Sequence, residues 1–363
     1  MSTLTCGFIG LGLIGGSIAK ALKAYDTSIH IVAFDINAHA LLLAKDEGIV
    51  DTLTPGIDAS FSSCDYIFLC APVSHNDENL TTLKKYLSKD CILTDVGSVK
   101  STTHKQITSL GLDAQFIGGH PMAGSERIGY QNSNASLLKN AYYILTPTKT
   151  VSSEKREQYR QLVENMGAIP LVLSPDRHDF VTAGISHLPH IIASTLVNLV
   201  KDTDSEDGIM KMIAAGGFKD ITRIASSSPV MWQQICLTNG ENISALLQKY
   251  IDALSLTKNA LDEQNAEALY QLFDTARTYR ESFVNASSGP IKKAFDMTVE
   301  IADKPGALAN VVNLLAAKEL SIKNIGITHN RESAEGSMHI EFYDDISANT
   351  AKELLTLVGY HCN

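Results

Sequence analysis

Short apolar runs and longer amphipathic runs alternate along the first half of the chain. Mostly apolar runs typical of strands cover residues 6–9, 30–34, 66–70, 92–94, 115–117, 141–145 and 169–173. Between them, amphipathic runs predict helices over residues 13–25, 38–47, 76–87 and 153–166. Strands that alternate with helices indicate a parallel sheet covered on both faces. We therefore expect an α/β domain over residues 1–175.

The pattern changes twice after residue 175. Helical spacing of apolar residues continues to about residue 288, and Ser287–Pro290 has the composition of a linker. This predicts an all-α domain over residues 176–290. Residues 296–363 then follow the order β-α-β-β-α with a very short last strand at 360–362, which predicts a C-terminal α+β ferredoxin-like module.

Composition narrows the class of protein. The 363 residues carry a net charge of −10, which argues against nucleic acid and anionic membranes as partners. Six scattered cysteines without a C-x-x-C pair indicate reduced thiols. We expect no leader peptide, and the apolar run Ile191–Val200 is too short and too polar to span a bilayer. The expected location is cytoplasmic.

A glycine-rich turn lies between the first strand and the first helix. Gly10, Gly12 and Gly15 fit G-x-G-x-x-G, with Leu13 and Ile14 opening the helix. In this context the first glycine permits a tight turn, the second lets a pyrophosphate approach, and the third lets helix and strand pack closely. Asp35 ends the second strand, where its carboxylate can bind ribose hydroxyls and repel a 2′-phosphate. We expect a Rossmann-type domain that binds NAD.

Two further loops follow predicted strands, at the edge of the sheet where ligands bind. The first is Cys70–Val73, of which Ala71, Pro72 and Val73 are candidate cofactor contacts. The second is Asp95–Lys100, in which Ser98 could bind substrate or nicotinamide. Ser98 could equally cap the helix that follows, and the residues alone leave both possibilities open.

The segment Gly118–Glu126 carries the main candidate base. His120 stands between paired glycines and a proline, directly after a predicted strand, so we expect it on a loop. Histidine is the usual general base because its pKa lies nearest neutrality. Alone, such a histidine more often caps a turn.

The predicted helical domain adds polar candidates. His187 and His190 are three residues apart, but no third ligand accompanies them, so we expect contacts to substrate or nicotinamide and no metal. Lys219 and Arg223 would share one face of a helix and could bind carboxylates. Asp220 could instead pair with Arg223, and both interpretations remain open. Trp232 is expected in the core.

Together these residues resemble the prephenate dehydrogenase family of tyrosine biosynthesis. The resemblance rests on the segments at 10–17, 95–100, 118–126, 186–190 and 216–225, which read GLGLIGGS, DVGSVK, GGHPMAGSE, SHLPH and GGFKDITRIA. It implies NAD-dependent oxidative decarboxylation of prephenate to 4-hydroxyphenylpyruvate, without a metal, by a homodimer. It implies that His120 takes the proton of the substrate hydroxyl and that Ser98 orients His120.

The resemblance also implies roles for the remaining candidates. Arg223 and His190 would bind substrate and His187 would lie near the nicotinamide. Three charged residues would surround the entrance, namely Lys219, Asp220 and Glu126. Ser125 shares the motif of Glu126 and is also expected at the substrate.

The last segment, 296–363, resembles an ACT domain, a regulatory module that binds amino acids. The resemblance implies feedback inhibition by tyrosine, with Asp303, Gly306 and Asn324 as effector contacts. A module that only extends the dimer is the alternative.

Three other functions stay open. The first is an arogenate or cyclohexadienyl dehydrogenase, because the residues that read the substrate side chain are not identifiable. The second is another β-hydroxyacid dehydrogenase, although such enzymes usually use a catalytic lysine. The third is a sensor that binds dinucleotide and amino acid without turnover.

Overall fold

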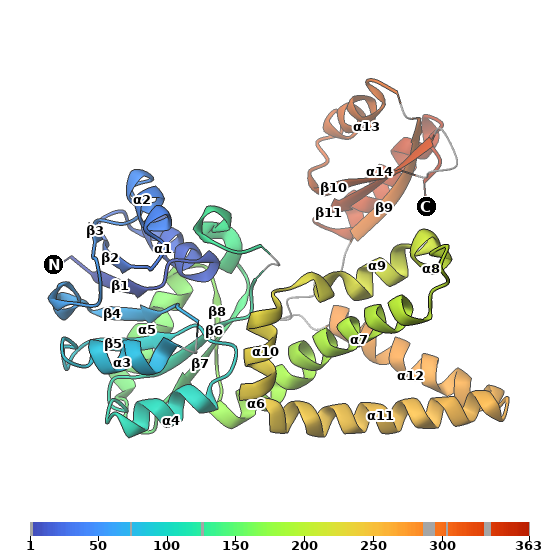
Figure 1. Ribbon diagram of the computed structural model, residues 1–363. Coiled ribbons are helices and arrows are strands. Elements are labelled where there is room, and N and C mark those ends of the chain that lie inside the picture. Colours follow the sequence, from blue (N-terminus) through green and yellow to red (C-terminus); the bar gives the residue numbers. More distant parts are fainter. Residues whose placement is uncertain are drawn as a thin grey trace. The chain divides into compact units, whose positions relative to one another are not determined.

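The computed structural model describes residues 3–72, 75–124, 127–285, 295–302, 304–329 and 335–362. The chain divides into two compact units, residues 1–265 and 266–363 (Figure 1). The boundaries of the three expected domains stay predictions.

The first unit begins with a five-stranded parallel sheet in the order β3-β2-β1-β4-β5. The strands are β1 (Thr5–Ile9), β2 (His30–Phe34), β3 (Thr52–Leu53), β4 (Tyr66–Leu69) and β5 (Ile92–Asp95). The helices between them are α1 (Leu13–Tyr25), α2 (Ala38–Asp46), α3 (Asn76–Leu83) and α4 (Ser101–Ser109). The predicted alternation of strands and helices is confirmed here, although α3 ends at Leu83 and not at 87, and no range was predicted for α4. The two-residue β3 is too short for periodicity to detect.

Side chains alternate between the two faces of this sheet. Phe8 and Phe68 pack with α1 and α2 on one face, and their rings stack with centroids 4.9 Å apart. Ile9 and Leu69 pack with α3 and α4 on the other face. Since both faces are covered, the carboxyl edge of the sheet is where its loops can meet a ligand.

A second sheet has the order β6-β7-β8, from β6 (Ile117–Pro121), β7 (Tyr142–Pro147) and β8 (Ile169–Val172). Helix α5 (Ser153–Asn165) joins β7 to the parallel β8. The expectation of purely parallel strands is wrong here, because β6 and β7 are antiparallel. Parallel neighbours need a crossover, usually helical, but the described part of the β6–β7 connection holds only two 3₁₀ turns, Tyr130–Asn132 and Ala135–Leu138.

Helices make up the rest of the first unit. They are α6 (Pro175–Thr182), α7 (Leu188–Thr203), α8 (Ile209–Ile213), α9 (Gly216–Thr222), α10 (Pro229–Thr238) and α11 (Gly240–Asp262). A π turn, Ala183–His187, joins α6 to α7, so that one helix runs from Pro175 to Thr203. By length and hydropathy this helix could cross a membrane, contrary to the expectation from Ile191–Val200, and only 22% of its apolar window is buried. The apolar length was underestimated because α6, the π turn and α7 form one continuous helix.

The second unit contains α12 (Ala266–Asn285) and the predicted α+β module. The module consists of β9 (Phe295–Ala302), α13 (Ala307–Ala316), β10 (Ile322–His329), β11 (Glu335–Phe342) and α14 (Asp345–Leu357). Its sheet is antiparallel, in the order β10-β11-β9, and a single bridge joins Cys362 to Val299. The βαββα order and the very short last strand are confirmed, and one core, which includes Val299, Val311 and Phe342, fills the module.

Candidate active site

The glycine turn has the geometry that a dinucleotide needs. Gly10 has φ +95°, and a Cβ there would lie 2.4 Å from the backbone nitrogen of Ala71. A Cβ on Gly15 would lie 2.6 Å from the carbonyl oxygen of Gly10, whereas one on Gly12 would meet nothing within 4 Å. Gly12 caps α1 without a side-chain hydrogen bond, so the first N–H groups of this helix remain for an anion. These residues fit a pyrophosphate, and Leu13 and Ile14 form the first turn behind it.

Asp35 lies directly after β2, as predicted. Its Oδ2 accepts a hydrogen bond from the backbone N–H of Leu11, at 2.5 Å, and its Oδ1 accepts one from Asn37, at 2.7 Å. The carboxylate therefore lies against the glycine turn, where a ribose would follow the pyrophosphate. Ala71 and Pro72 follow β4, and Ala71 touches the turn at Gly10.

His120 lies in β6, paired with Ile144 of β7, so the expected loop is a strand. We expected the paired glycines, Gly118 and Gly119, to end the strand. Instead they let neighbouring groups approach the backbone of β6. A Cβ on Gly118 would clash with Thr146, and one on Gly119 would lie 2.7 Å from the carbonyl oxygen of Asp95. Large side chains cannot fit at either position, so the glycines are compatible with a tightly packed strand.

His120 belongs to the same edge as the glycine turn. Phe116, just before β6, bridges Leu93 of β5 in parallel, and the N–H of Gly119 donates to Asp95 Oδ1 at 3.2 Å. Because β1, β4 and β5 are parallel and adjacent, their carboxyl ends share this edge. The sheet thus brings a candidate base and a candidate nucleotide site to one edge.

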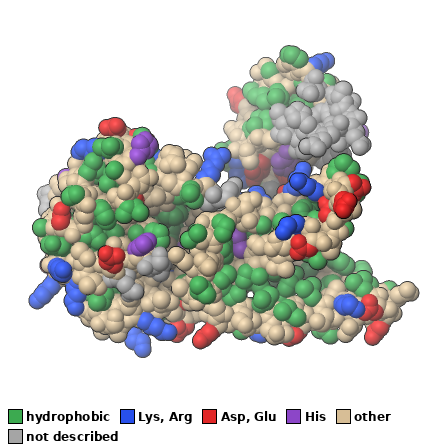
Figure 2. Space-filling model, in the orientation of Figure 1, with side chains coloured by type: hydrophobic (Ala, Val, Ile, Leu, Met, Phe, Trp, Pro, Cys, Tyr) green, Lys and Arg blue, Asp and Glu red, His purple; other side chains and the backbone are tan. Residues whose placement is uncertain are grey.

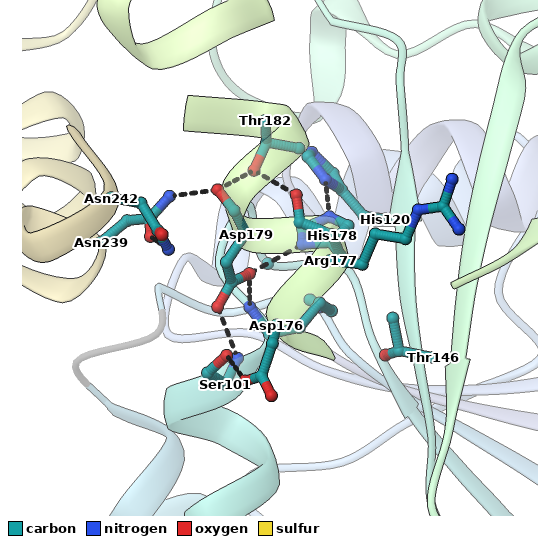
Figure 3. A network of polar contacts seen from close by, with 12 residues as sticks. Ser101, His120, Thr146, Asp176, Arg177, His178, Asp179, Thr182, Asn239 and Asn242 are labelled. Atoms are coloured by element: carbon teal, nitrogen blue, oxygen red, sulfur yellow. Dashed lines mark hydrogen bonds and ion pairs between the residues drawn. The ribbon is translucent and has the colours of Figure 1, made fainter. Parts of the chain in front are cut away.

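A chain of three side chains joins His120 to the helices (Figure 3). His120 Nδ1 lies 2.7 Å from His178 Nε2, and His178 Nδ1 lies 2.7 Å from Asp179 Oδ1. Burial, together with His178, Lys100 and His187, holds the pKa of His120 well below its usual range. His120 is therefore neutral at neutral pH, as a general base must be.

His178 and Asp179 are not among the site residues predicted from the sequence. They are adjacent polar residues in the first turns of α6, and the structure buries both completely. Spacing in the sequence cannot show, however, that they meet a histidine 58 residues earlier.

Ser98 is half-buried in the loop after β5. It does not cap α4, because that helix begins at Ser101 with Lys100 at its N-cap position. The carboxylate of Asp179 accepts hydrogen bonds from the N–H groups of Lys100 and Ser101 instead, at 2.7 and 2.8 Å. The capping interpretation of Ser98 is wrong, and its hydroxyl is not used there.

His187 and His190 lie close to Trp232 of α10. The His190 ring stacks on the indole with centroids 3.7 Å apart, and the His187 ring meets it edge-on at 5.9 Å. Burial and His178 lower the pKa of His187 to about 4. Trp232 is half-buried against these histidines, so the expected core residue contacts the site.

Arg223 follows α9 and begins a 3₁₀ turn, Arg223–Ser226, so the expected single helix through Lys219 and Arg223 ends at Thr222. Both cations are exposed. Burial lowers the pKa of His190, and the charge of Arg223 lowers it further, which places Arg223 in electrostatic range of His190. Helix α7 packs against both α9 and this turn.

Four predicted residues lie outside the described residues, namely Val73, Ser125, Glu126 and Asp303. Gly306 caps α13 with φ +87°, and Asn324 lies on β10. Within the described ranges, no group of three or more His, Cys, Asp or Glu side chains could hold a metal ion.

Comparisons with known proteins agree with this geometry. Residues 18–171 match the family model "Prephenate dehydrogenase, nucleotide-binding domain", and residues 174–275 match "Prephenate dehydrogenase, dimerization domain". The prephenate dehydrogenase of Bacillus subtilis is 34% identical over 95% of this chain and 94% of its own length. The cyclohexadienyl dehydrogenase of Zymomonas mobilis is 31% identical over 75% of this chain and 93% of its own.

A solved structure is also similar. The prephenate dehydrogenase of Aquifex aeolicus, in complex with hydroxyphenyl propionate and NAD⁺, has a TM-score of 0.73 and 33% identity, covering 78% of this chain and 99% of that one. From the two family matches and these likenesses over most of its length, the chain belongs to the prephenate dehydrogenase family.

Proposed function

We propose that this protein catalyses the NAD-dependent oxidative decarboxylation of prephenate to 4-hydroxyphenylpyruvate. The observation that supports this most is the position of His120, a half-buried histidine whose pKa is held well below its usual range, at the same sheet edge as the glycine turn. NAD⁺, when bound, supplies the acceptor for the hydride that leaves C4 of the substrate. Gly10, Gly12, Gly15 and Asp35 would hold it.

The protein's own residues then have four tasks. His120 accepts the proton of the 4-hydroxyl group as hydride leaves C4, and returns it to that oxygen once CO₂ has left C1 and the ring is aromatic. Arg223, within electrostatic range of His190, binds a carboxylate of the dianion, since guanidinium pairs with carboxylates through two parallel hydrogen bonds. Ser98, free of a capping role, orients the hydroxyl group. Lys219 adds positive charge near the entrance.

NADH absorbance tests this function directly. Purified protein with NAD⁺ should turn over prephenate, and His120→Asn should lower kcat about 10²–10⁴-fold, the usual contribution of a general base. A loss below about threefold would remove His120 from this role. Turnover of arogenate in place of prephenate would keep the mechanism and change the substrate, and turnover of neither would favour a sensor.

Activity on both substrates is the second candidate function. The similar protein from Zymomonas mobilis is named a cyclohexadienyl dehydrogenase, so the two substrates should be assayed side by side. The described residues proposed to bind substrate, His120, His190 and Arg223, do not by themselves distinguish a ketone from an amine in the side chain.

A homodimer is the proposed assembly, in the cytoplasm. Residues 174–275 match a domain described as a dimerization domain. Exposed apolar side chains in this range include Leu199, Leu254 and Leu256. Hydrophobic side chains are widespread on the surface of the helical part in Figure 2. A partner subunit would cover this surface, which explains why α7 is apolar without spanning a membrane. Light scattering after gel filtration should give twice the chain's mass of 39.3 kDa.

The C-terminal module is proposed to be an ACT domain that binds tyrosine. Its element order and antiparallel sheet support this assignment, and Gly306 and Asn324, together with Asp303, are the proposed contacts. Tyrosine should inhibit turnover, and Gly306→Val should remove this inhibition while leaving activity without tyrosine unchanged. If tyrosine neither binds nor inhibits, the module would have only a structural role in the dimer.

A further inference from the structure

The chain of contacts from His120 to Asp179 constrains which nitrogen of each ring can carry a proton. Both members beyond His120 are buried, with His178 0% and Asp179 1% exposed. Burial raises the pKa of Asp179, but hydrogen bonds from His178, Ser101 and the backbone outweigh burial and lower it. Asp179 is therefore an ionised carboxylate, which can only accept hydrogen bonds.

The direction of each hydrogen bond follows from this charge. Because Asp179 Oδ1 accepts, His178 Nδ1 must carry the proton of that 2.7 Å contact. With a single proton, on Nδ1, the His178 ring has a lone pair on Nε2, and His120 Nδ1 then donates to it across the other 2.7 Å contact. A neutral His120 with its proton on Nδ1 has a lone pair on Nε2.

We propose that His178 and Asp179 are positioning residues that hold His120 in the tautomer with a free Nε2, the only form that can take a proton from substrate at that atom. The proposal rests on the proposed role of His120 as the base. When His120 Nε2 accepts the proton, the ring becomes an imidazolium whose Nδ1–H still donates to His178. The negative charge of Asp179 then stabilises this cation through His178.

The surroundings hold the pair in place from two sides. Asp179 accepts from the N–H groups of Lys100 and Ser101, at the start of α4. The carbonyl oxygens of His178 and Asp179 accept from Thr182 Oγ1, at 2.9 Å, and from Asn239 Nδ2, at 2.8 Å. These contacts link β6, α4, α6 and α10–α11 around His120, as Figure 3 shows for most of these residues. Because these hydrogen bonds hold His178 and Asp179 in place, the two residues can fix the tautomer of His120.

Other groups around His120 oppose its protonation. Lys100, the neighbouring His187 and burial itself all disfavour the imidazolium. Asp179, at the end of the hydrogen-bonded chain, is the anion that offsets these effects and favours the imidazolium. Without this chain, either tautomer of His120 is available, and the cation formed during the reaction loses its support.

A matched pair of substitutions tests the proposal. His178→Gln keeps an acceptor, because the amide oxygen can take the place of Nε2, whereas His178→Leu has a similar volume and no acceptor. We expect His178→Leu to lower kcat about 10²-fold, with the KM for NAD⁺ unchanged, and His178→Gln to recover most of the loss. Equal losses in both variants would overturn the proposal.

A double-mutant cycle separates this inference from the role of His120. In a His120→Asn background, His178→Leu should cost little more, since the two residues act as one unit. Independent, multiplicative losses would overturn the proposal and leave a structural role for His178. If His120→Asn itself does not lower kcat, the proposed role of His120 as the base is wrong, whatever the effect of His178→Leu.

Nitrogen-15 NMR of histidine-labelled protein reads the tautomer without any substitution in the chain. The His120 signals, identified by their absence in His120→Asn, should show a protonated Nδ1 and an unprotonated Nε2 at neutral pH. A proton on Nε2 would overturn the proposal even if His178→Leu failed to fold.

Discussion

The ammonium group of Lys100 lies 2.5 Å from Asp95 Oδ2, and both side chains are buried, at 0% and 1% exposure. The same nitrogen donates to the carbonyl oxygen of Gly119 at 2.7 Å, directly before His120. This ion pair therefore holds β5 against β6 beside the candidate base.

Removing the cation should destabilise the fold. Lys100→Met leaves Asp95 as a buried charge without its partner, and we expect the free energy of unfolding to fall by about 3–5 kcal/mol. Urea unfolding measures this change. Lys105→Met, on the exposed side of α4, is the control and should change stability by less than about 0.5 kcal/mol. Equal effects of the two variants would contradict the ion pair's importance.

Asp35 should determine the preference for NAD⁺. Asp35→Asn keeps one acceptor for the N–H of Leu11 but loses the negative charge. We expect kcat/KM with NAD⁺ to fall about 10–100-fold, as for a lost hydrogen bond to a charged group, and the ratio of NADP⁺ to NAD⁺ use to rise. Steady-state kinetics with both cofactors measures this. A similar fall for both would mean that Asp35 only supports the turn.

Arg223 should act on substrate binding. Arg223→Ala removes a bidentate partner for carboxylate, so KM for prephenate should rise about 10–100-fold with a smaller change in kcat. Lys249→Ala removes an exposed positive charge from α11 and should leave KM unchanged. An unchanged KM in Arg223→Ala would favour an ion pair with Asp220 as the residue's role.

Stability should fall in mild acid because of buried histidines. Burial lowers the pKa of His187 to about 4 from 6.5, so the folded state binds fewer protons than the unfolded state between these values. Stability is fully present above about pH 6.5 and is lost as the pH falls towards 4, by up to about 1.4 kcal/mol per pH unit for this residue. Melting temperatures across this range measure the loss. His187→Gln should show a shallower decline, and an identical decline would contradict the assignment.

Local patterns in the sequence were sufficient for most of the elements. Strand β2 and helix α1 have the predicted bounds, because their apolar spacing is set by the face that each buries. The glycine turn was equally predictable, since Gly10, Gly12 and Gly15 act through backbone geometry within six residues. The order of elements in the C-terminal module was also predictable, because it follows from local apolar spacing.

The tertiary structure decided how the candidate site is arranged. Glycine has a low propensity for strands, yet Gly118 and Gly119 lie in β6. Thr146 and Asp95 leave no room for side chains at these two positions. Asp179 caps a helix 79 residues earlier in the chain, and His178 meets His120 across 58 residues. Such contacts depend on how separate elements pack, and the hydrophobic pattern fixes only which face of each element is buried. Which buried histidine contacts another, and so where its proton lies, is decided by packing.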